Sequence, residues 1–455
     1  MPPARLGRAV ASSLLWFVLV RGAPGQAATR DTVLGNGLEV IIAEHHSLPQ
    51  ATVVLAVRTG AFTQDARQDG LAHLYEHLLF RTYPRGLSGF ARDANAIEAG
   101  WNGVTTEDLV EYFLEAPSRN AGTAIKILSR LARGAKFSEK DMKAERPIVL
   151  DELARDLSSP LARLELEVHR RLWGDSWSRK DVGGDSASVS ALPLTDIQRQ
   201  FERYYVPNNA ALIVSGDVDA AAVIAEAQDA FAPWTRGPDP SAGQPPITVT
   251  TIGRTTVVLM PADVSDVTFL IASQGPSAAP DSLDPYAVTV LSEILNEPSS
   301  AFQRRLVGRG LLQGVTANYD WGRYSGEVQI HARATVDHAG RGLLMLLNEL
   351  QVMDALTGVD AEDIRIAARH RAVGDAFDEE LANHVAGTLA QWWAGPGVSA
   401  YPSFGKRLSA VTPADLARVA ASYFGDRPRV IGVLADARGI AAVRAALSAP
   451  GAANP

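Results

Sequence analysis

The sequence predicts an α+β fold of two homologous domains, each an α/β roll in which helices pack against a mixed or antiparallel sheet. The length of 455 residues exceeds what one hydrophobic core usually serves, and two domains of roughly 200 residues each fit better. Hydrophobic residues make up 46% and charged residues 21%, as in ordinary globular proteins. The two halves also share segments of similar pattern, which indicates an internal duplication.

The later segments of the two halves correspond most clearly. LTDIQRQFERYYVPNNAALIVSGD, from Leu194, resembles ADLARVAASYFGDRPRVIGVLAD near the end of the chain. Tyr204 aligns with Tyr423, and Asp217 aligns with Asp436. In both copies a helical pattern ends in an aromatic pair, and an apolar run then reads as a buried strand. Each half is therefore expected to end in helix, strand and a further helix.

The earlier segments of the two halves also align. LEVIIAEHHSLPQATVVLAVRTG, ending at Gly60, corresponds to TVVLMPADVSDVTFLIASQG, ending at Gly275. Both read as two strands followed by a loop and a helix. In this alignment, His73, Glu76 and His77 lie opposite Val288, Leu291 and Ser292. The residues of the second half cannot form the same metal site. The second half is expected to keep the scaffold and to lack the site.

A connection rich in Pro, Gly and Ser, RGPDPSAGQPP, separates the halves and is interpreted as a linker at residues 236–246. The first domain is then 29–235 and the second 247–450. Helices and strands alternate without a strict βαβ rhythm, so α+β layers are favoured over a doubly wound parallel sheet.

Residues 1–28 are interpreted as a cleaved secretory signal. Arg5 and Arg8 precede an apolar run from Ala9 to Val20, and small residues follow it. The run is shorter than the ~20 residues that span a bilayer, so a permanent anchor is the weaker alternative. No later segment could form a stable membrane span, and the protein is expected in the periplasm or outside the cell.

Charge and cysteine content exclude several classes of partner and site. A net charge of -8 makes nucleic acid or an anionic membrane surface an unfavourable partner, because both need a basic face. The absence of cysteine excludes disulfides, thiol nucleophiles and thiolate metal sites. A zinc site in this chain must therefore use histidine and carboxylate ligands.

The segment GLAHLYEHLLF, from Gly70, predicts a helix that carries metal ligands. His73 and His77 are one helical turn apart, so both imidazoles reach one ion. Glu76 lies three residues from His73, where a carboxylate can take the proton of a zinc-bound water whose pKa falls to ~7. The alternative is that the histidines are structural and Glu76 is only a helix-stabilising charge.

A second helical segment, SEKDMKAERPIVLDELARDL, offers a third ligand. It opens with a capping pattern at Ser138 and carries Glu145 and Glu152 two turns apart on one face. One carboxylate could bind the metal while the other orients a ligand. Acidic residues on a helix more often form a solvated face, and Pro147 between the two bends the helix axis, which weakens the prediction of a common face.

At these residues the chain resembles the pitrilysin or insulinase family of zinc metallopeptidases, the inverzincins. The likeness covers nearly all of the chain after the leader, and includes NGLEVIIAEHHS, from Asn36, and YYVPNNAALIVSGD, from Tyr204. The resemblance implies one zinc ion per chain, half of a clamshell-like peptidase chamber, and five site roles. It assigns zinc to His73, His77 and Glu152, catalysis to Glu76 as base, and support to Glu145.

The segment WNGVTTEDLVEYF, from Trp101, is similar to the family's edge strand, on which a peptide substrate lies as an added strand. The resemblance implies substrate contacts along four consecutive residues: Asn102, Gly103, Val104 and Thr105. The alternative is a plain Asn-Gly turn that leads a hairpin.

Active members of the family also carry an Arg and a Tyr in the second half, seven residues apart, and here the matching positions are Leu306 and Gln313. Shifted alignments offer pairs of the wrong spacing: Arg309 with Tyr319, or Arg323 with Tyr324. Some bacterial members divide these parts between two subunits. The chain therefore resembles the zinc-bearing subunit of a heterodimer, and a homodimer is the less favoured alternative.

The leading hypothesis is an endopeptidase that hydrolyses oligopeptides or unfolded segments. A second hypothesis is a non-catalytic scaffold or peptide-binding subunit with the same fold. A third, metal storage or sensing, would require several exposed histidine clusters, and only His45-His46 offers one. A scaffold has no reason to keep Glu76 with both histidines, which favours the enzyme.

Overall fold

The computed structural model describes residues 18–20, 29–133, 135–176, 179–244, 246–279, 281–355, 359–378 and 380–449. The predicted leader, residues 1–28, lies outside this part of the chain except for a short strand at Val18–Val20. Among the described helices, none combines the length and the apolar character that crossing a membrane requires.

The first domain is built on a seven-stranded mixed sheet in the order β1-β2-β3-β7-β4-β6-β5. Its strands are β1 (Val18–Val20), β2 (Thr29–Val33), β3 (Glu39–Glu44), β4 (Gln50–Val57), β5 (Gly100–Thr105), β6 (Val110–Pro117) and β7 (Ala210–Gly216). Its helices are α1 (Leu71–Thr82), α2 (Gly86–Ala96), α3 (Ala121–Arg133), α4 (Glu139–Asp156), α5 (Pro160–Trp173), α6 (Ser186–Ala191), α7 (Leu194–Tyr204) and α8 (Ala220–Phe231).

The second domain is built on a five-stranded mixed sheet in the order β10-β11-β9-β12-β8. Its strands are β8 (Thr256–Pro261), β9 (Asp266–Gly275), β10 (Gly314–Asp320), β11 (Gly326–Thr335) and β12 (Val430–Ala435). Its helices are α9 (Asp284–Asn296), α10 (Ala301–Leu306), α11 (Ala339–Gln351), α12 (Ala361–Asp378), α13 (Ala382–Ala394), α14 (Phe404–Ser409), α15 (Pro413–Val419) and α16 (Ala437–Leu447). The predicted linker falls in the segment between α8 and β8.

The two sheets confirm the predicted duplication. Without β1 and β2, the first sheet reads β3-β7-β4-β6-β5, and the second reads β8-β12-β9-β11-β10 in the same order. The pairs β3–β7 and β8–β12 are parallel, and every other pair in these five-strand units is antiparallel. Two α/β domains with mixed sheets are therefore present, as predicted.

The alignment of the earlier segments, which ends on Gly60 and Gly275, is wrong by one residue. Val53 of β4 and Phe269 of β9 occupy equivalent positions in the two sheets. Each faces the core of its own domain, and the residues that they pair with, in β7 and β12, are equivalent to each other. A shift of one residue would turn each side chain to the opposite face of the sheet. The lack of the motif in the second domain does not depend on this register, because α9 contains no histidine.

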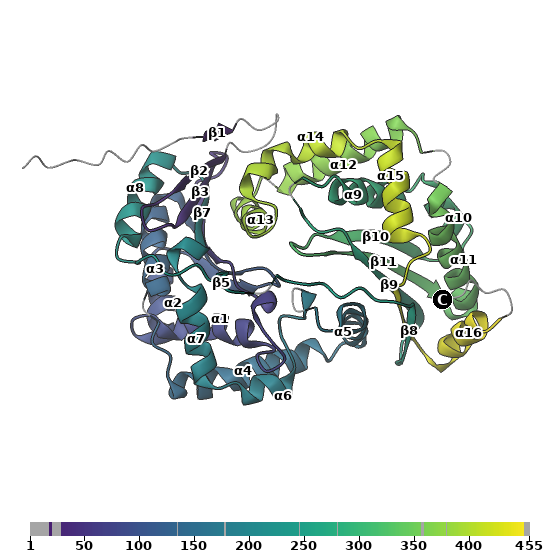
Figure 1. The fold of residues 1–455 in the computed structure, drawn as a ribbon, viewed down its shortest axis with the longest axis horizontal. Helices are drawn as coiled ribbons and strands as arrows, with labels where there is room; N and C mark the ends of the chain where they lie inside the picture. The colour runs from purple at the N-terminus through teal and green to yellow at the C-terminus, as the bar shows by residue number, and fades with distance from the viewer. Residues whose placement is uncertain are drawn as a thin grey trace, which may run out of the picture.

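Each sheet is covered on one face by helices of its own domain and on the other by a helix of the other domain (Figure 1). In the first domain, α1, α3 and α8 pack on one face, and α13 of the second domain packs against β4 and β7 on the other. In return, α5 of the first domain packs against β9 and β12.

Apolar side chains make both exchanged contacts. On the first sheet, α13 buries Val385, Leu389 and Trp393 against residues such as Ile41 and Ile213. On the second sheet, the buried partners are Leu164, Val168 and Leu172 of α5 against Val258, Leu270 and Val430. Because each domain supplies a helix that packs on the sheet of the other, the two domains form one structural unit.

A buried group of charges adds a third contact between the domains. Glu327 of β11 is 2% exposed and accepts a 2.6 Å hydrogen bond from Nε1 of Trp173. Nδ1 of His169 lies 3.4 Å from the same carboxylate, and Arg179 pairs with Asp320 at 2.5 Å. Burial alone would raise the pKa of Glu327, but the bonds from His169 and Trp173 and the charge of Arg179 lower it to about 2.

We expect Leu389→Ala to destabilise the protein by about 2–5 kcal/mol, because it leaves a cavity under a fully buried side chain. Although Leu389 belongs to the second domain, hydrogen exchange should accelerate in β4 and β7 of the first. Leu381→Ala, at a side chain 43% exposed beside the same helix, serves as control. If hydrogen exchange accelerates only in the strands of the second domain, α13 does not stabilise the sheet of the first domain.

Candidate metal centre

A cavity of about 1070 Å³ lies where α1, α4, β5 and α5 of the first domain face β9, β10 and β11 of the second. Its lining includes all nine site residues predicted from the sequence: His73, Glu76, His77, Glu145, Glu152, Asn102, Gly103, Val104 and Thr105. The structure thus brings every predicted site residue to one cavity.

Helix α1 presents its two histidines to this cavity. The helix begins after Gly70, whose φ of 83° lies in the left-handed region that favours glycine. A Cβ at Gly70 would also lie 2.7 Å from the backbone oxygen of Gly183, so the loop that contains Gly183 packs directly on the start of α1. One turn apart, the rings of His73 and His77 have centroids separated by 5.0 Å.

Helix α4 supplies the carboxylates. Ser138 caps its start by accepting a hydrogen bond from the backbone N–H of Asp141, as the sequence predicts. The helix continues through Pro147, and both Glu145 and Glu152 reach the histidines of α1. The concern that the proline would separate the two carboxylates is therefore wrong.

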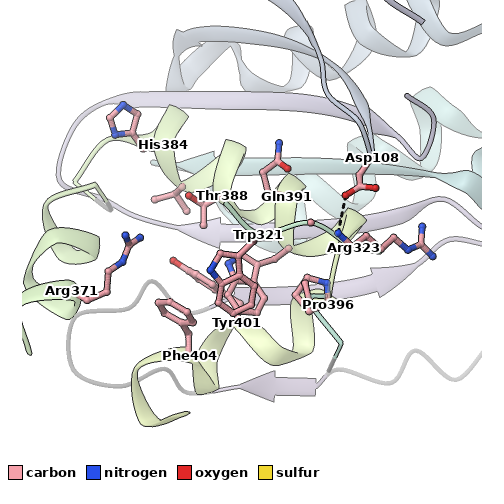
Figure 2. A pocket seen from close by; sticks show the side chains of 15 residues that line it. Asp108, Trp321, Arg323, Arg371, His384, Thr388, Gln391, Pro396, Tyr401 and Phe404 are labelled. Carbon is pink, nitrogen blue, oxygen red and sulfur yellow. Dashed lines mark hydrogen bonds between the residues drawn. The ribbon is translucent and has the colours of Figure 1, made fainter. Parts of the chain in front are cut away.

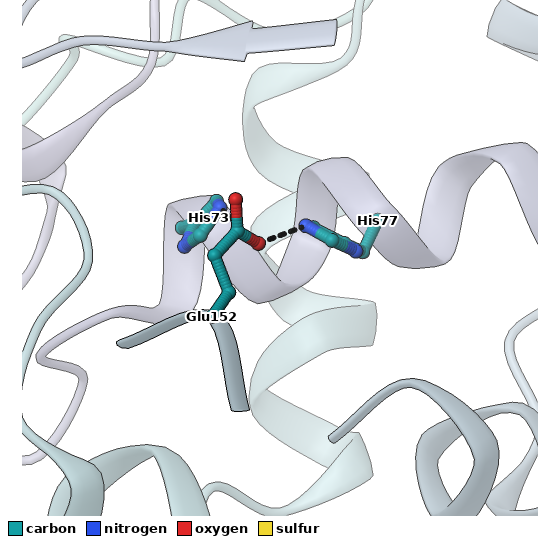
Figure 3. Close-up of side chains that lie close together, drawn as sticks. All are labelled: His73, His77 and Glu152. Atoms are coloured by element: carbon teal, nitrogen blue, oxygen red, sulfur yellow. Dashed lines mark ion pairs between the residues drawn. The ribbon is translucent and has the colours of Figure 1, made fainter. Parts of the chain in front are cut away.

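Three donors converge between the helices (Figure 3). Oε2 of Glu152 lies 3.3 Å from Nε2 of His77 and 3.8 Å from Nε2 of His73, and all three ligand atoms lie within 4.8 Å of one another. Ligands of tetrahedral zinc at ~2.0–2.2 Å are themselves separated by roughly 3.3–3.6 Å. Two imidazoles and one carboxylate at this spacing suit a zinc ion with one position left open.

Glu145 supports His77 from behind. Its carboxylate accepts a 3.3 Å hydrogen bond from Nδ1 of His77 and a second from Nε of Arg81. Burial pushes the pKa of Glu145 up, but these two donors outweigh burial and hold it below its ordinary value. An ionised Glu145 fixes the ring so that Nε2 faces the cavity, which is the orientation that a metal ligand needs.

The environment of His73 favours a neutral ring. Burial and the nearby His77 lower the pKa of His73, and a neutral imidazole is the form that binds a metal. Its Nδ1 is buried and has no hydrogen-bond partner in the described part of the chain. His77 is therefore the histidine held by a hydrogen bond, and His73 is held by packing.

Glu76 lies one residue from His77, at the base of the cavity and 7% exposed. Burial raises its pKa to about 7, although His77 and a hydrogen bond from Thr105 act in the opposite direction. The Thr105 hydroxyl donates that bond over 3.1 Å to Oε2. Near neutral pH, Glu76 can therefore both accept and release a proton.

Strand β5 forms the edge of the first sheet, and its free side borders the cavity. Asn102 and Gly103 lie within this strand, so the alternative interpretation of an Asn-Gly turn is wrong. A Cβ at Gly103 would lie 2.3 Å from Oε1 of Glu76. Only glycine allows the strand to approach the carboxylate this closely.

The second domain contributes no arginine or tyrosine to the described lining of this cavity. Leu306 is buried in α10, and Gln313 binds Asp266 away from the site. The shifted alternatives also lie elsewhere: Tyr319 donates to the backbone of Pro276, and Arg309, Arg323 and Tyr324 are absent from the lining. The second domain instead provides Leu270, Asp320, Glu327 and Gln329.

Three residues act at this site in ways that the sequence did not reveal. Arg81 binds Glu145, and its position one turn after His77 could have suggested this contact. The Thr105 side chain binds Glu76, whereas the resemblance implied only a substrate contact for this residue. His169, which no motif in the sequence connects with the site, borders the cavity and binds Glu327, 158 residues further along the chain.

The fold and the donor set define a two-domain protein with an inverted H-x-x-E-H metal motif. The family model described as Insulinase (Peptidase family M16) matches residues 39–183, which contain the motif and Glu152. A second model, Peptidase M16 inactive domain, matches residues 191–369. The chain belongs to the insulinase family, peptidase family M16, and has its two-domain bacterial form.

Relatives of this family are similar over part of their length. An uncharacterized zinc protease of Streptomyces coelicolor is 25% identical over 225 residues, which are 49% of each chain. An uncharacterized zinc protease of Mycobacterium leprae is 25% identical over 339 residues, 74% of this chain and 76% of the relative. For the Streptomyces protein the chain thus spans about half the length of the curated relative that it matches.

Solved structures share the fold. A protease from Helicobacter pylori has a TM-score of 0.79 at 19% identity, covering 90% of this chain and 99% of that one. The periplasmic protease PqqL of Escherichia coli has a TM-score of 0.75 at 17% identity, covering 96% of this chain and 52% of its own length.

We expect Glu145→Gln to weaken zinc binding about 10–100-fold, because a neutral amide accepts the bond from His77 less strongly and leaves Arg81 unpaired. Competition with a chromophoric chelator measures the affinity. Asp151→Asn, at an exposed carboxylate beside Glu152 on the same helix, should bind zinc as the wild type does. Equal affinity of all three proteins would show that Glu145 does not support the metal centre.

Proposed function

We propose that the protein is a zinc endopeptidase that binds one zinc ion through His73, His77 and Glu152 and hydrolyses oligopeptides or unfolded segments. The observation that carries this proposal is the convergence of these three donors beside the buried carboxylate of Glu76. The relatives named as zinc proteases support the choice of metal and reaction.

Zinc, when bound, supplies Lewis-acid chemistry, because it acidifies a coordinated water and polarises a peptide carbonyl. Glu76 accepts the proton of the attacking water and returns it to the leaving amine. Its burial and its pKa of about 7 suit both transfers. The bond from Thr105 and the close approach of Gly103 hold the Glu76 carboxylate in place at the cavity wall.

The peptide is held as an additional strand on β5. The outer edge of this strand carries backbone N–H and C=O groups that β6 does not pair. Backbone pairing along Asn102, Gly103, Val104 and Thr105 binds many sequences alike and places the chain beside Glu76. Extended and flexible peptides are therefore favoured over folded proteins.

We expect Glu76→Gln to retain zinc and to lower kcat about 10²–10⁴-fold, because the metal ligands remain and the general base is lost. Cleavage of a quenched fluorescent peptide measures the rate, and metal analysis measures the zinc content. Glu139→Gln, an exposed residue in the first turn of α4, serves as the matched control. Unchanged turnover in the Glu76 variant would refute the mechanism and leave a non-catalytic, peptide-binding subunit as the function.

We further propose that a second subunit of the same family completes the site. The second domain contributes carboxylates and an amide to the lining of the cavity. Among the described residues, no arginine or tyrosine of the second domain lines it. A partner with the Arg and Tyr pair would close the chamber as a heterodimer and bind the substrate opposite β5.

The chain alone should cleave peptide slowly, and addition of such a partner from the same genome should raise kcat/KM at least about 10²-fold, the usual effect of one transition-state donor. Light scattering of the mixture should show a one-to-one complex. If the purified chain works at full rate without a partner, the proposal of a heterodimer fails, whereas the metal mechanism stands.

The site of action is proposed to be the periplasm or the extracellular space. The predicted leader at residues 1–28 supports this, and the similar fold of PqqL, described as periplasmic, agrees. Sequencing of the mature N-terminus tests the proposal, and a start near residue 29 is expected.

A further inference from the structure

A second, smaller cavity of about 250 Å³ lies beside the metal cavity and has no role in the proposed reaction (Figure 2). Glu107 and Asp320 line the metal cavity, whereas the next residue of each turn, Asp108 and Trp321, lines this one. The two cavities are thus separated by the tips of the β5–β6 and β10–β11 hairpins. The backbone N–H of Arg323 joins these tips by donating a 3.1 Å hydrogen bond to Asp108.

Four aromatic side chains of the second domain form the wall of this cavity, which we call the aromatic pocket: Trp321, Trp392, Tyr401 and Phe404. Each ring contacts another, with centroids 5.5 Å apart for Trp392 and Phe404 and 5.8 Å apart for Trp321 and Trp392. Trp321 and Trp392 are only half-buried. Such a wall binds a flat apolar group by stacking and edge contacts.

Charged groups stand at the two ends of the aromatic pocket (Figure 2). Arg371 of α12 and His384 of α13 lie at one end, and Asp108 lies at the other. The Arg371 guanidinium offers a fork of N–H donors that fits a carboxylate. Thr388 and Gln391 of α13 add polar groups along the wall.

Asp108 is a poor binding group for a cationic ligand. One of its oxygens already accepts the bond from Arg323, and the other is buried out of reach. Burial raises the pKa of Asp108 to about 6, because removal from water disfavours the charged form. The opposite end of the pocket carries the guanidinium of Arg371, a group whose chemistry suits an anionic ligand.

We propose that the aromatic pocket binds an aromatic side chain next to a free carboxylate, as in the C-terminal residue of a peptide. The ring packs against the wall formed by Trp321, Trp392 and Phe404, and the carboxylate pairs with Arg371. Pockets for drug-sized molecules measure roughly 300–1,000 Å³, so a volume of 250 Å³ fits one such residue and excludes a long chain. A free aromatic amino acid presents the same two groups and is the other source of this chemistry.

Calorimetry on the zinc-loaded chain tests the assignment with N-acetyl-L-phenylalanine, which mimics a peptide C-terminus. The matched probe is N-acetyl-L-phenylalaninamide, which keeps the ring and lacks the carboxylate. Free L-phenylalanine distinguishes the two sources, because it adds an ammonium group. Arg371→Gln is compared with Arg369→Gln, an exposed arginine of the same helix that lies outside the pocket.

We expect the acid to bind about tenfold more tightly than the amide, the value of one charge-assisted pair. Arg371→Gln should raise the Kd of the acid about tenfold and leave that of the amide unchanged, and Arg369→Gln should change neither. Equal affinity for acid and amide in the wild type would overturn the proposal without any variant. An acid affinity that Arg371→Gln leaves intact would also overturn it and would indicate binding at the metal. The proposal stands or falls separately from the peptidase activity, since binding alone is measured.

Discussion

The packing of α1 against α4 places two imidazoles from one helical turn opposite a carboxylate from another helix. Each helix alone offers common side chains, and their meeting creates a centre that suits a divalent cation. The sheet beneath α1 and the loop on Gly70 fix the first helix, and the cap at Ser138 sets the start of the second. The reactive geometry therefore depends on how the two helices are held against each other.

The exchange of α5 and α13 between the domains determines what faces this centre. Because α5 covers the second sheet, its neighbour α4 faces β9 to β11 across one cavity that both domains line. The buried group around Glu327 fixes this contact, since removal of either partner would leave a charge without compensation. The same hairpin tips that border the metal cavity also border the aromatic pocket. The two cavities thus share a boundary.

Local patterns in the sequence revealed the motif helix, the cap of α4, the two carboxylates and the duplicated sheets, because each depends on spacing within a short segment. The register between the repeats was one residue wrong, because the alignment matched Gly60 with Gly275, which lie seven residues after Val53 and six residues after Phe269. Helix exchange could not be predicted, because an amphipathic pattern such as that of α13 does not identify which sheet it covers. For the same reason the contact of His169 with Glu327 was missed: the two residues meet only through the exchange.

The central claim is that one metal ion joins His73, His77 and Glu152, and anomalous diffraction at the zinc edge from crystals grown with zinc tests it most directly. The account predicts a single strong peak in each chain, ~2.0–2.2 Å from Nε2 of both histidines and from a Glu152 oxygen. A peak elsewhere, or a Glu152 carboxylate that stays outside the coordination sphere of the ion, would contradict it.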